Sequence, residues 1–159
     1  MGGNLGDVAR RLQEALRGLA ALPGTQVEAV SSLYRTRPVE SSGPDYLNAV
    51  AVLQSSLGPR ELLHALLALE LTHDRERPYQ NAPRTLDLDL LWYGACHCDT
   101  PTLTLPHPRM MQRAFVLVPL AEVLKSLKGD VMPALPDATA VAALAQAQGI
   151  EAAGVLDLR

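Results

Sequence analysis

Two aspartates alternate with leucines in one stretch of the chain, Ala82-Pro83-Arg84-Thr85-Leu86-Asp87-Leu88-Asp89-Leu90-Leu91. Strict alternation of apolar and polar residues is the pattern of a β-strand with one buried face. On such a strand Asp87 and Asp89 share a face, with their Cα atoms about 6.6 Å apart. Neighbouring carboxylates repel each other unless a cation lies between them, and Mg²⁺ prefers oxygen ligands that it shares with substrate phosphates. The pair therefore predicts a magnesium site. A half-exposed strand that displays two aspartates is the alternative.

The composition is that of an ordinary globular protein. The 159 residues are 48% hydrophobic and 19% charged, with a net charge of −3, which predicts a single domain over residues 1–159 with a sizeable core. This charge gives no argument for binding nucleic acid or an acidic membrane. No apolar run approaches the roughly 18 residues of a membrane span, and no basic-then-apolar leader precedes the first helix, so we expect a cytoplasmic protein. Cys96 and Cys98 are too close in sequence to staple a fold, and no second pair completes a zinc site.

The order of the expected elements favours an α+β fold, with an antiparallel sheet covered by helices. Helical spacing runs from Val8 to Leu22 behind a candidate N-cap, Asp7, and again from Pro59 to Leu71, with proline in the first turn. Two more helices are expected at 110–124 and 138–148. Strands are expected at 27–34 and 46–53, paired as an antiparallel hairpin, at 86–90 in the same sheet, and at 155–158 in the tail. A ferredoxin-like βαββαβ core fits if a strand precedes the first helix.

Six motifs in this order resemble those of the 6-hydroxymethyl-7,8-dihydropterin pyrophosphokinases. The motifs are Asn4-Leu5-Gly6-Asp7, Ser32-Leu33-Tyr34-Arg35-Thr36, Pro44-Asp45-Tyr46-Leu47-Asn48, Pro83-Arg84-Thr85-Leu86-Asp87-Leu88-Asp89, Pro106-His107-Pro108 and Arg113-Ala114-Phe115. The resemblance covers residues 2 to about 125 and leaves a C-terminal helix and tail, 126–159, outside it. It implies a ferredoxin-like α+β fold and an enzyme of folate biosynthesis. That reaction moves the diphosphate of ATP to the hydroxymethyl oxygen of the pterin and releases AMP.

The resemblance also implies an ATP site. Asp87 and Asp89 resemble the family's metal-binding pair, so two Mg²⁺ ions roughly 3.5–4 Å apart would bridge them to the triphosphate. A metal beside the pterin hydroxyl would ease its deprotonation, so no separate general base is needed. Arg84 joins the two aspartates as a catalytic residue. The residues expected to bind ATP are Glu70, Arg75, Arg77, Arg84, Thr104, His107 and Arg113. Guanidinium groups suit phosphate oxygens, although each arginine alone is also compatible with a solvated surface charge, His107 with a rigid loop contact and Glu70 with an exposed helix position.

A pterin pocket is implied next to the ATP site. Tyr46 and Phe115 are expected to stack on the two faces of the ring, and Asn48 offers a donor and an acceptor to its amide and amine edge. Thr36 and the backbone of Arg37 and Val39 would complete the wall. The alternatives are that Phe115 belongs to the core and that Asn48 faces solvent.

The chain departs from the family pattern at its beginning. Family members carry an apolar strand before this point, and here only Met1 precedes Gly2, so the resemblance leads us to expect a truncated N-terminal strand. Residues 1–4, residues 155–158 or a partner chain must then pair the backbone groups that this strand would cover.

Two functions follow from these observations. The first is the ATP-dependent enzyme, expected to act as a monomer on ATP and 6-hydroxymethyl-7,8-dihydropterin with Mg²⁺. The alternative is a non-catalytic ferredoxin-like module that binds a pterin or nucleotide, or a truncated inactive relative. The acidic pair on the sheet argues against nucleic acid.

Overall fold

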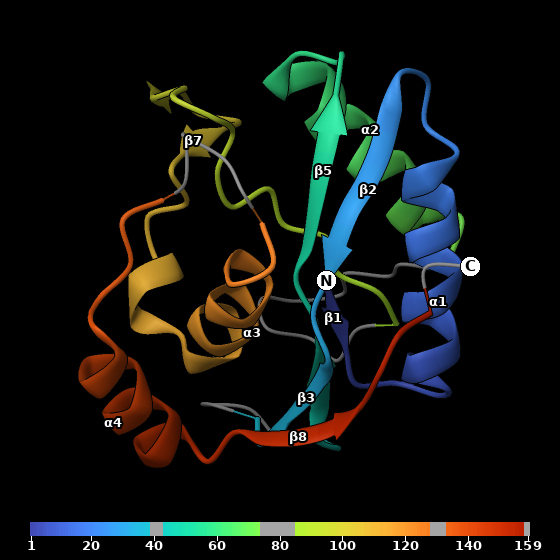
Figure 1. Ribbon diagram of the computed structural model, residues 1–159. Helices are drawn as coiled ribbons and strands as arrows, with labels where there is room; N and C mark the ends of the chain where they lie inside the picture. Colours follow the sequence, from blue (N-terminus) through green and yellow to red (C-terminus); the bar gives the residue numbers. More distant parts are fainter. Residues whose placement is uncertain (39–42, 74–84, 128–132, 158–159) are drawn as a thin grey trace.

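A long antiparallel hairpin runs through the middle of the molecule in the computed structural model, which describes residues 1–38, 43–73, 85–127 and 133–157 (Figure 1). One half of the hairpin pairs β2 (Thr25–Val30) with β5 (Ala51–Ser55). The other half pairs β3 (Leu33–Thr36) with β4 (Tyr46–Asn48). The antiparallel pairing predicted between residues 27–34 and 46–53 is therefore confirmed.

Each arm of the hairpin is interrupted, so the expectation of two continuous strands was wrong. Ser31 and Ser32 separate β2 from β3, and Ala49 and Val50 separate β4 from β5. At the break, the Ser31 N–H donates to the Val50 carbonyl at 2.9 Å, and the Ser31 hydroxyl accepts from the Val50 N–H, also at 2.9 Å. The Ser31 hydroxyl thus accepts a hydrogen bond that a backbone carbonyl would accept in a regular ladder. Serine side chains compete with regular secondary structure in this way.

Short strands extend the sheet on both sides of β3 and β4. The order is β1-β4-β3-β8, where β1 is Gly2–Gly3 and β8 is Glu151–Gly154, and all neighbours are antiparallel. Residues of the first four thus pair with β4, which is one of the predicted routes, and the C-terminal tail pairs with β3. The tail strand lies before the predicted 155–158, because residues 151–154 are the ones that reach the edge of β3.

Over its described residues, 85–91, the aspartate stretch meets this sheet at one position. The Gly2 N–H donates to the Asp87 carbonyl at 2.9 Å and the Asp87 N–H donates to the Gly2 carbonyl at 2.7 Å. The prediction of a full strand over 86–90 was wrong, because β1 is two residues long and offers little backbone to pair with. The alternation of the stretch is nevertheless confirmed: Leu86 and Leu88 are buried, and Asp89 is exposed.

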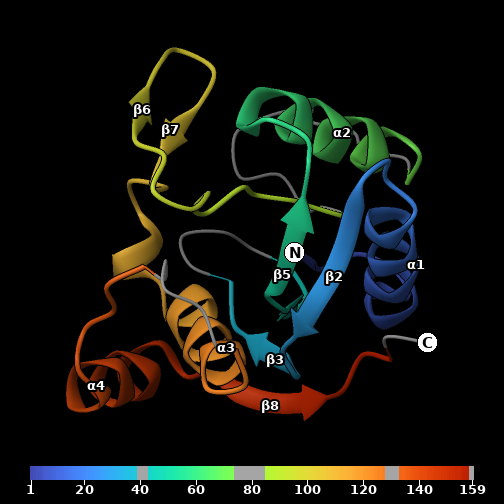
Figure 2. The same cartoon turned by 45° about the horizontal axis from the view of Figure 1, so that its top comes forward.

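Helices cover both faces of the strands (Figures 1 and 2). On one side lie α1 (Val8–Ala20) and α2 (Pro59–Leu71), and on the other side lies α3 (Ala114–Leu124), with α4 (Ala138–Gln148) beside it. Apolar side chains fill the space between the strands and each helix layer. The predicted antiparallel sheet with covering helices, and the α+β class, are confirmed.

The helix termini follow the sequence signals. The Asp7 carboxylate accepts from the Arg10 N–H at the start of α1, and Pro59 occupies the first turn of α2. The helix expected over 110–124 is divided into a 3₁₀ turn η1 (Met110–Gln112) and α3, with Arg113 extended between them. A small hairpin of β6 (Cys98–Asp99) and β7 (Thr104–Leu105) precedes this pair. No helix in the described ranges is long and apolar enough to cross a membrane.

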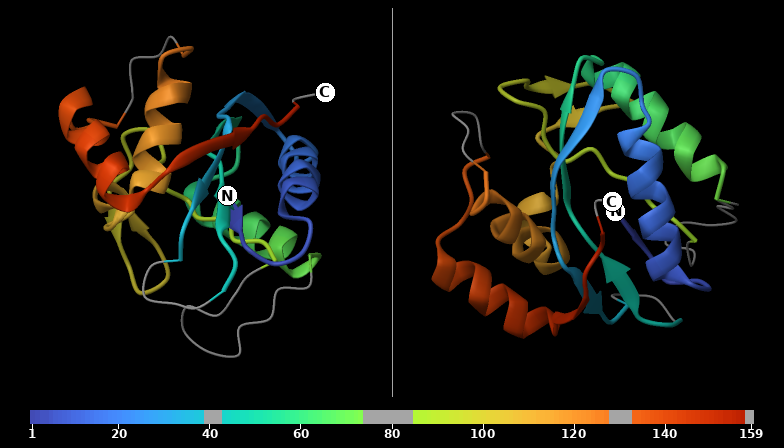
Figure 3. Two further views of the ribbon diagram at one scale, coloured as in Figure 1. Left: turned by 90° about the horizontal axis from the view of Figure 1, so that it is seen from below. Right: turned by 45° about the vertical axis from the view of Figure 1, so that its right-hand side comes forward.

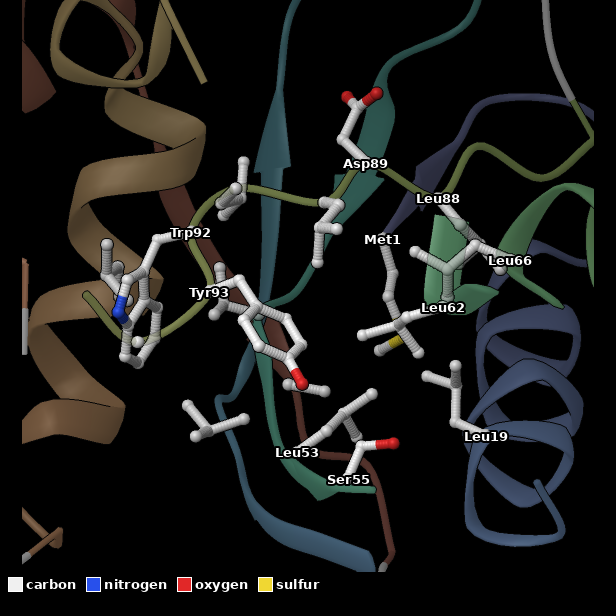
Figure 4. A pocket seen from close by; sticks show the side chains of 17 residues that line it. Met1, Leu19, Leu53, Ser55, Leu62, Leu66, Leu88, Asp89, Trp92 and Tyr93 are labelled. Atoms are coloured by element: carbon white, nitrogen blue, oxygen red, sulfur yellow. The ribbon is translucent and has the colours of Figure 1, made fainter. Parts of the chain in front are cut away.

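A cavity of about 280 Å³ lies between β5 and the segment 88–94 (Figure 4). Its lining is mostly apolar, and the Met1 side chain points into it together with those of Leu62 and Leu88, whereas the Asp89 carboxylate points away. Met1 exchanges two backbone hydrogen bonds of 2.9 Å with Ala49, the residue before the cavity wall. The cavity therefore lies directly before β1 in the chain direction, at the N-terminus, which is inside the molecule (Figure 3). Within the described residues, β5 pairs only with β2.

We expect that four alternating valines and isoleucines added before Met1 will raise the melting temperature by roughly 5 °C, because 1 kcal/mol corresponds to about 2–4 °C in a chain of this size. Each apolar side chain that enters the cavity contributes about 1.5–3 kcal/mol, partly offset by the entropy of ordering. The measurement is thermal unfolding followed by circular dichroism. An extension of the same length made of glycine and serine is the control. Equal melting temperatures for the two variants would contradict the expectation that an added apolar strand fills the cavity.

Candidate active site

One row of residues crosses the sheet and brings the predicted metal and pterin residues to the same face. Asp87 lies opposite Gly2, Gly2 opposite Asn48, and Asn48 opposite Tyr34. Residues directly opposite on antiparallel strands project from the same face. Thr36 and its partner Tyr46 lie two residues further along β3 and β4, so they share that face as well. This surface is called the site face below.

Gly2 occupies the middle of the row and contributes no side chain. A Cβ atom at this position would lie 2.5 Å from Oδ1 of Asn48, which shows how closely the amide covers the glycine. The backbones of Asp87 and Asn48 are separated by two strand spacings, about 9–10 Å. Gly2 therefore leaves room for the Asn48 amide on the site face and places no side chain of its own between that amide and Asp87. Sequence reasoning did not single out Gly2; its place two residues before Asn4 in a Gly-x-Asn pattern was the available signal.

Asn48 is held in position by Thr36. Its Nδ2 donates to the Thr36 hydroxyl at 3.1 Å, and both residues are only 6% exposed. The alternative of a solvent-facing Asn48 is therefore wrong. Tyr46 is half-buried at the start of β4, and Arg37 is exposed just after β3. Val39 lies outside the described residues.

Phe115 lies in the first turn of α3, and Arg113 directly precedes this helix. The Arg113 guanidinium lies over the Phe115 ring, with Cζ 5.4 Å from the ring centroid, a cation–π distance. Phe115 is half-buried and packs against the apolar layer beneath α3. It thus takes part in the core with part of its surface and keeps the rest accessible.

A carboxylate on α3 fixes this helix to the strands of the site face. Glu122 accepts from the Ser32 N–H at 3.1 Å, from the Ser32 hydroxyl at 2.8 Å and from the Tyr34 hydroxyl at 2.9 Å. Desolvation, followed by the hydrogen bond and charge of Glu122, raises the pKa of Tyr34 to about 12. Since Tyr34 lies opposite Asn48, Glu122 connects α3 to the row that contains the predicted pterin residue. Sequence reasoning missed Glu122; a single acidic residue in the apolar run 116–124 was the signal.

Glu70, on α2, supports the backbone of the aspartate pair. It is 1% exposed, and its Oε1 accepts from the Leu88 N–H at 2.7 Å. That amide lies between Asp87 and Asp89, so a carboxyl oxygen on α2 orients the backbone from which both aspartate side chains project. The alternative of an exposed helix glutamate is wrong, and a contact of Glu70 with nucleotide remains a prediction.

His107 lies close to the acidic Asp89 and the basic Arg113 of the site. Its backbone N–H donates to Leu91 at 2.7 Å, and its Nδ1 accepts from the Arg109 N–H at 3.2 Å, which places the proton of the neutral ring on Nε2. Desolvation lowers the pKa of His107; the charge of Asp89 opposes this, and those of Arg113 and Arg109 add to it. The structure therefore brings His107, Asp89 and Arg113 within electrostatic reach of one another.

Of the remaining predicted ATP residues, Thr104 is the one that the described ranges include. Thr104 lies in β7, where its hydroxyl contacts Asp99 at 3.1 Å, and no described contact connects it with the aspartate pair. Arg75, Arg77 and Arg84 fall outside the described residues, so their predicted phosphate contacts stay predictions.

The donor set on the site face fits magnesium. Asp87 and Asp89 present two carboxylates at alternate positions above a buried leucine ladder, one half-buried and one exposed. Mg²⁺ is usually bound by one or two carboxylates together with substrate phosphates and water. In the described ranges, no cluster of three His, Cys, Asp or Glu side chains forms a cage that would hold a metal without substrate.

Comparison with known proteins gives one consistent result. The sequence model of the family described as 7,8-dihydro-6-hydroxymethylpterin-pyrophosphokinase matches residues 1–125. The protein of Synechocystis sp. named 2-amino-4-hydroxy-6-hydroxymethyldihydropteridine pyrophosphokinase is 49% identical over 77% of this chain, and the match spans 63% of its own length. Proteins of the same name from Pseudomonas aeruginosa and Bacillus subtilis are 43% and 35% identical, over 80% and 95% of this chain and 80% and 91% of their own lengths.

The matched region contains every residue of the site face described above, and the relatives' name is that of the activity which the six motifs predicted. The chain belongs to the 7,8-dihydro-6-hydroxymethylpterin-pyrophosphokinase family, the ATP-dependent diphosphotransferases of folate synthesis.

Proposed function

We propose that this chain transfers the diphosphate of ATP to the hydroxymethyl oxygen of 6-hydroxymethyl-7,8-dihydropterin on the site face. The observation that supports this most is the row Asp87–Gly2–Asn48. It puts a carboxylate and a pterin-type hydrogen-bonding amide on one surface, with a side-chain-free residue between them. The hydroxymethyl group of a pterin held by Asn48 would then point along this row toward the aspartates.

The pterin pocket is formed by β3, β4 and the start of α3. Asn48 uses one Nδ2 hydrogen on Thr36, so its other hydrogen and Oδ1 would serve the amide and amine edge of the ring. Tyr46 and Phe115 would stack on the two faces of the ring. The backbone of Arg37 and Val39 would close the pocket wall.

The triphosphate would lie along the aspartate side of the site face. Asp87 and Asp89 would hold Mg²⁺, which when bound neutralises phosphate charge and makes the pterin hydroxyl more acidic. Arg113 and His107 are placed to bind phosphate oxygens, one as a fixed cation and the other as a neutral Nε2–H donor. Glu70 orients the aspartate backbone, and Arg75, Arg77, Arg84 and Thr104 remain the expected further ATP contacts.

The chemical step is an in-line displacement. The hydroxymethyl oxygen of the pterin forms a bond to the β-phosphorus of ATP and loses its proton, the bond between the β-phosphorus and the α,β-bridging oxygen breaks, and AMP leaves with the electron pair. Positioning and charge neutralisation provide most of the catalysis in such reactions. We expect the enzyme to work in the cytoplasm as a monomer.

Replacing either aspartate by asparagine tests the metal site. We expect Asp87→Asn and Asp89→Asn to lower kcat by roughly 100-fold or more, the scale of losing a major electrostatic contribution, with little loss of stability because repulsion between carboxylates is relieved. AMP release and thermal unfolding are the measurements.

The matched control is Asp137→Asn, an exposed change at the N-cap of α4, where the Asp137 carboxylate accepts from the Ala140 N–H. Asparagine caps helices as well as aspartate does, so this variant should behave like the wild type. Near-normal AMP release by both site variants would rule out the metal assignment. Pterin binding without AMP release by the wild type would favour the non-catalytic module.

Replacing Phe115 separates pterin binding from nucleotide binding. We expect Phe115→Ala to weaken pterin binding by about 1–3 kcal/mol, the scale of stacking on an aromatic ring, and to change nucleotide affinity little. Isothermal titration with each ligand is the measurement. Phe115→Leu is the control for packing: it keeps apolar volume but has no ring face, so it should also weaken pterin binding. If Phe115→Leu binds pterin normally, or if nucleotide affinity falls equally, Phe115 acts only as part of the core.

A further inference from the structure

The last residue of α4 reaches the first residue of α3 through its side chain. Oε1 of Gln148 accepts from the Ala114 N–H at 2.8 Å, and Nε2 of Gln148 donates to the Gln112 carbonyl at 2.9 Å. One amide therefore contacts two peptide groups of the main chain. This arrangement is called the Gln148 clamp below.

The clamp holds both peptide groups that flank Arg113. The Gln112 carbonyl belongs to the peptide before Arg113, and the Ala114 N–H belongs to the peptide after it. The rotations φ and ψ of Arg113 relate these two peptide planes to its Cα, so holding both planes fixes both rotations. Arg113 has an extended conformation, with φ −119° and ψ 111°, between η1 and α3.

The clamp also supplies a cap that the local sequence lacks. The first N–H groups of a helix have no partner within the helix and are usually satisfied by a Ser, Thr, Asp or Asn side chain at the preceding position. In α3 that position is Arg113, which has no acceptor atom and makes no cap with its side chain. Gln148 provides the acceptor from another helix.

We propose that Gln148 is a positioning residue of the active site, which sets the directions of Arg113 and Phe115 through the backbone between them. This inference rests on the proposed function, because those side chains are the expected phosphate and pterin contacts. It assigns a role to the C-terminal segment, which lies beyond the family match at residue 125.

The surrounding fold holds Gln148 in place. α4 packs beside α3 and ends at Gly149, whose φ of 63° favours glycine and turns the chain. The chain then enters β8, which pairs with β3, with Glu151 opposite Arg35 and Ala152 opposite Tyr34 (Figures 1 and 2). The strand that carries Thr36 and the helix that carries Phe115 are thus joined through the C-terminal segment.

A second glutamine provides a matched control. Oε1 of Gln13 accepts from the Asp157 N–H at 2.9 Å, and Nε2 of Gln13 donates to the Asp157 carbonyl. The chemistry matches that of the Gln148 clamp, but it connects α1 to the tail and does not contact Arg113 or Phe115. Gln13→Ala should therefore remove a similar clamp without affecting the site.

The test compares Gln148→Ala, Gln148→Glu and Gln13→Ala with the wild type. The measurements are amide exchange at Ala114 by NMR, calorimetric Kd values for the pterin and a non-hydrolysable ATP analogue, and kcat and KM for AMP release. Gln148→Ala should speed exchange at Ala114 and weaken pterin binding roughly two- to tenfold, the effect of losing one or two hydrogen bonds. Gln148→Glu keeps an acceptor for the Ala114 N–H at a helix N-terminus but loses the donor to the Gln112 carbonyl, so it should retain slow exchange at Ala114 and bind the pterin with an affinity between those of the wild type and Gln148→Ala.

Equal pterin affinity in Gln148→Ala and the wild type would overturn the inference. An equal loss in Gln13→Ala would also overturn it, since the effect would then be one of general stability. If Gln148→Ala does not fold, the comparison of Gln148→Glu with Gln13→Ala decides: recovery of slow exchange and of part of the affinity supports the clamp, and loss of both contradicts it. Failure of the proposed function would be seen separately, as an absence of pterin binding or AMP release in the wild type.

Discussion

The pairing of Gly2 with its two neighbours is the constraint on which the site depends. Two hydrogen bonds to Asp87 and the ladder to Asn48 make this short strand the bridge between the aspartate stretch and the hairpin. Without the bridge, no described backbone bond would fix which face Asp87 takes relative to Asn48. The register of one residue thus decides that the two halves of the site meet, since a shift of one would turn the side chains to opposite faces.

Two buried or half-buried glutamates hold the aspartate stretch and α3 in place. Glu70 orients the backbone under the aspartates, and Glu122 fixes α3 to β3. Both carboxylates accept backbone or hydroxyl hydrogens, so each satisfies polar groups that the apolar layers would otherwise leave without partners. The acidic side chains are therefore of two kinds: Glu70 and Glu122 support the backbone and the helix from within the fold, and Asp87 and Asp89 project from the site face.

Local patterns in the sequence predicted much of this arrangement. The alternation around Leu86 and Leu88 gave their burial correctly, and Asp7 and Pro59 marked helix starts, because burial periodicity and capping depend on a few neighbouring residues. The hairpin and the six motifs gave the fold class and the family. The break at Ser31 and the short bridge at Asp87 were not predicted, because a side chain and a distant glycine decide them. Glu122 was missed for the same reason: its partners are about 90 residues away in sequence.

The apolar cavity beside β5 has a consequence for spectroscopy. Trp92 is the only tryptophan of the chain, and it lies in the wall of this cavity while also packing against the layer beneath α3 (Figure 4). The tryptophan emission of the protein therefore comes from one indole, in the wall of the cavity that a group entering it would contact. Tryptophan fluorescence should therefore report on the filling of this cavity without an added label.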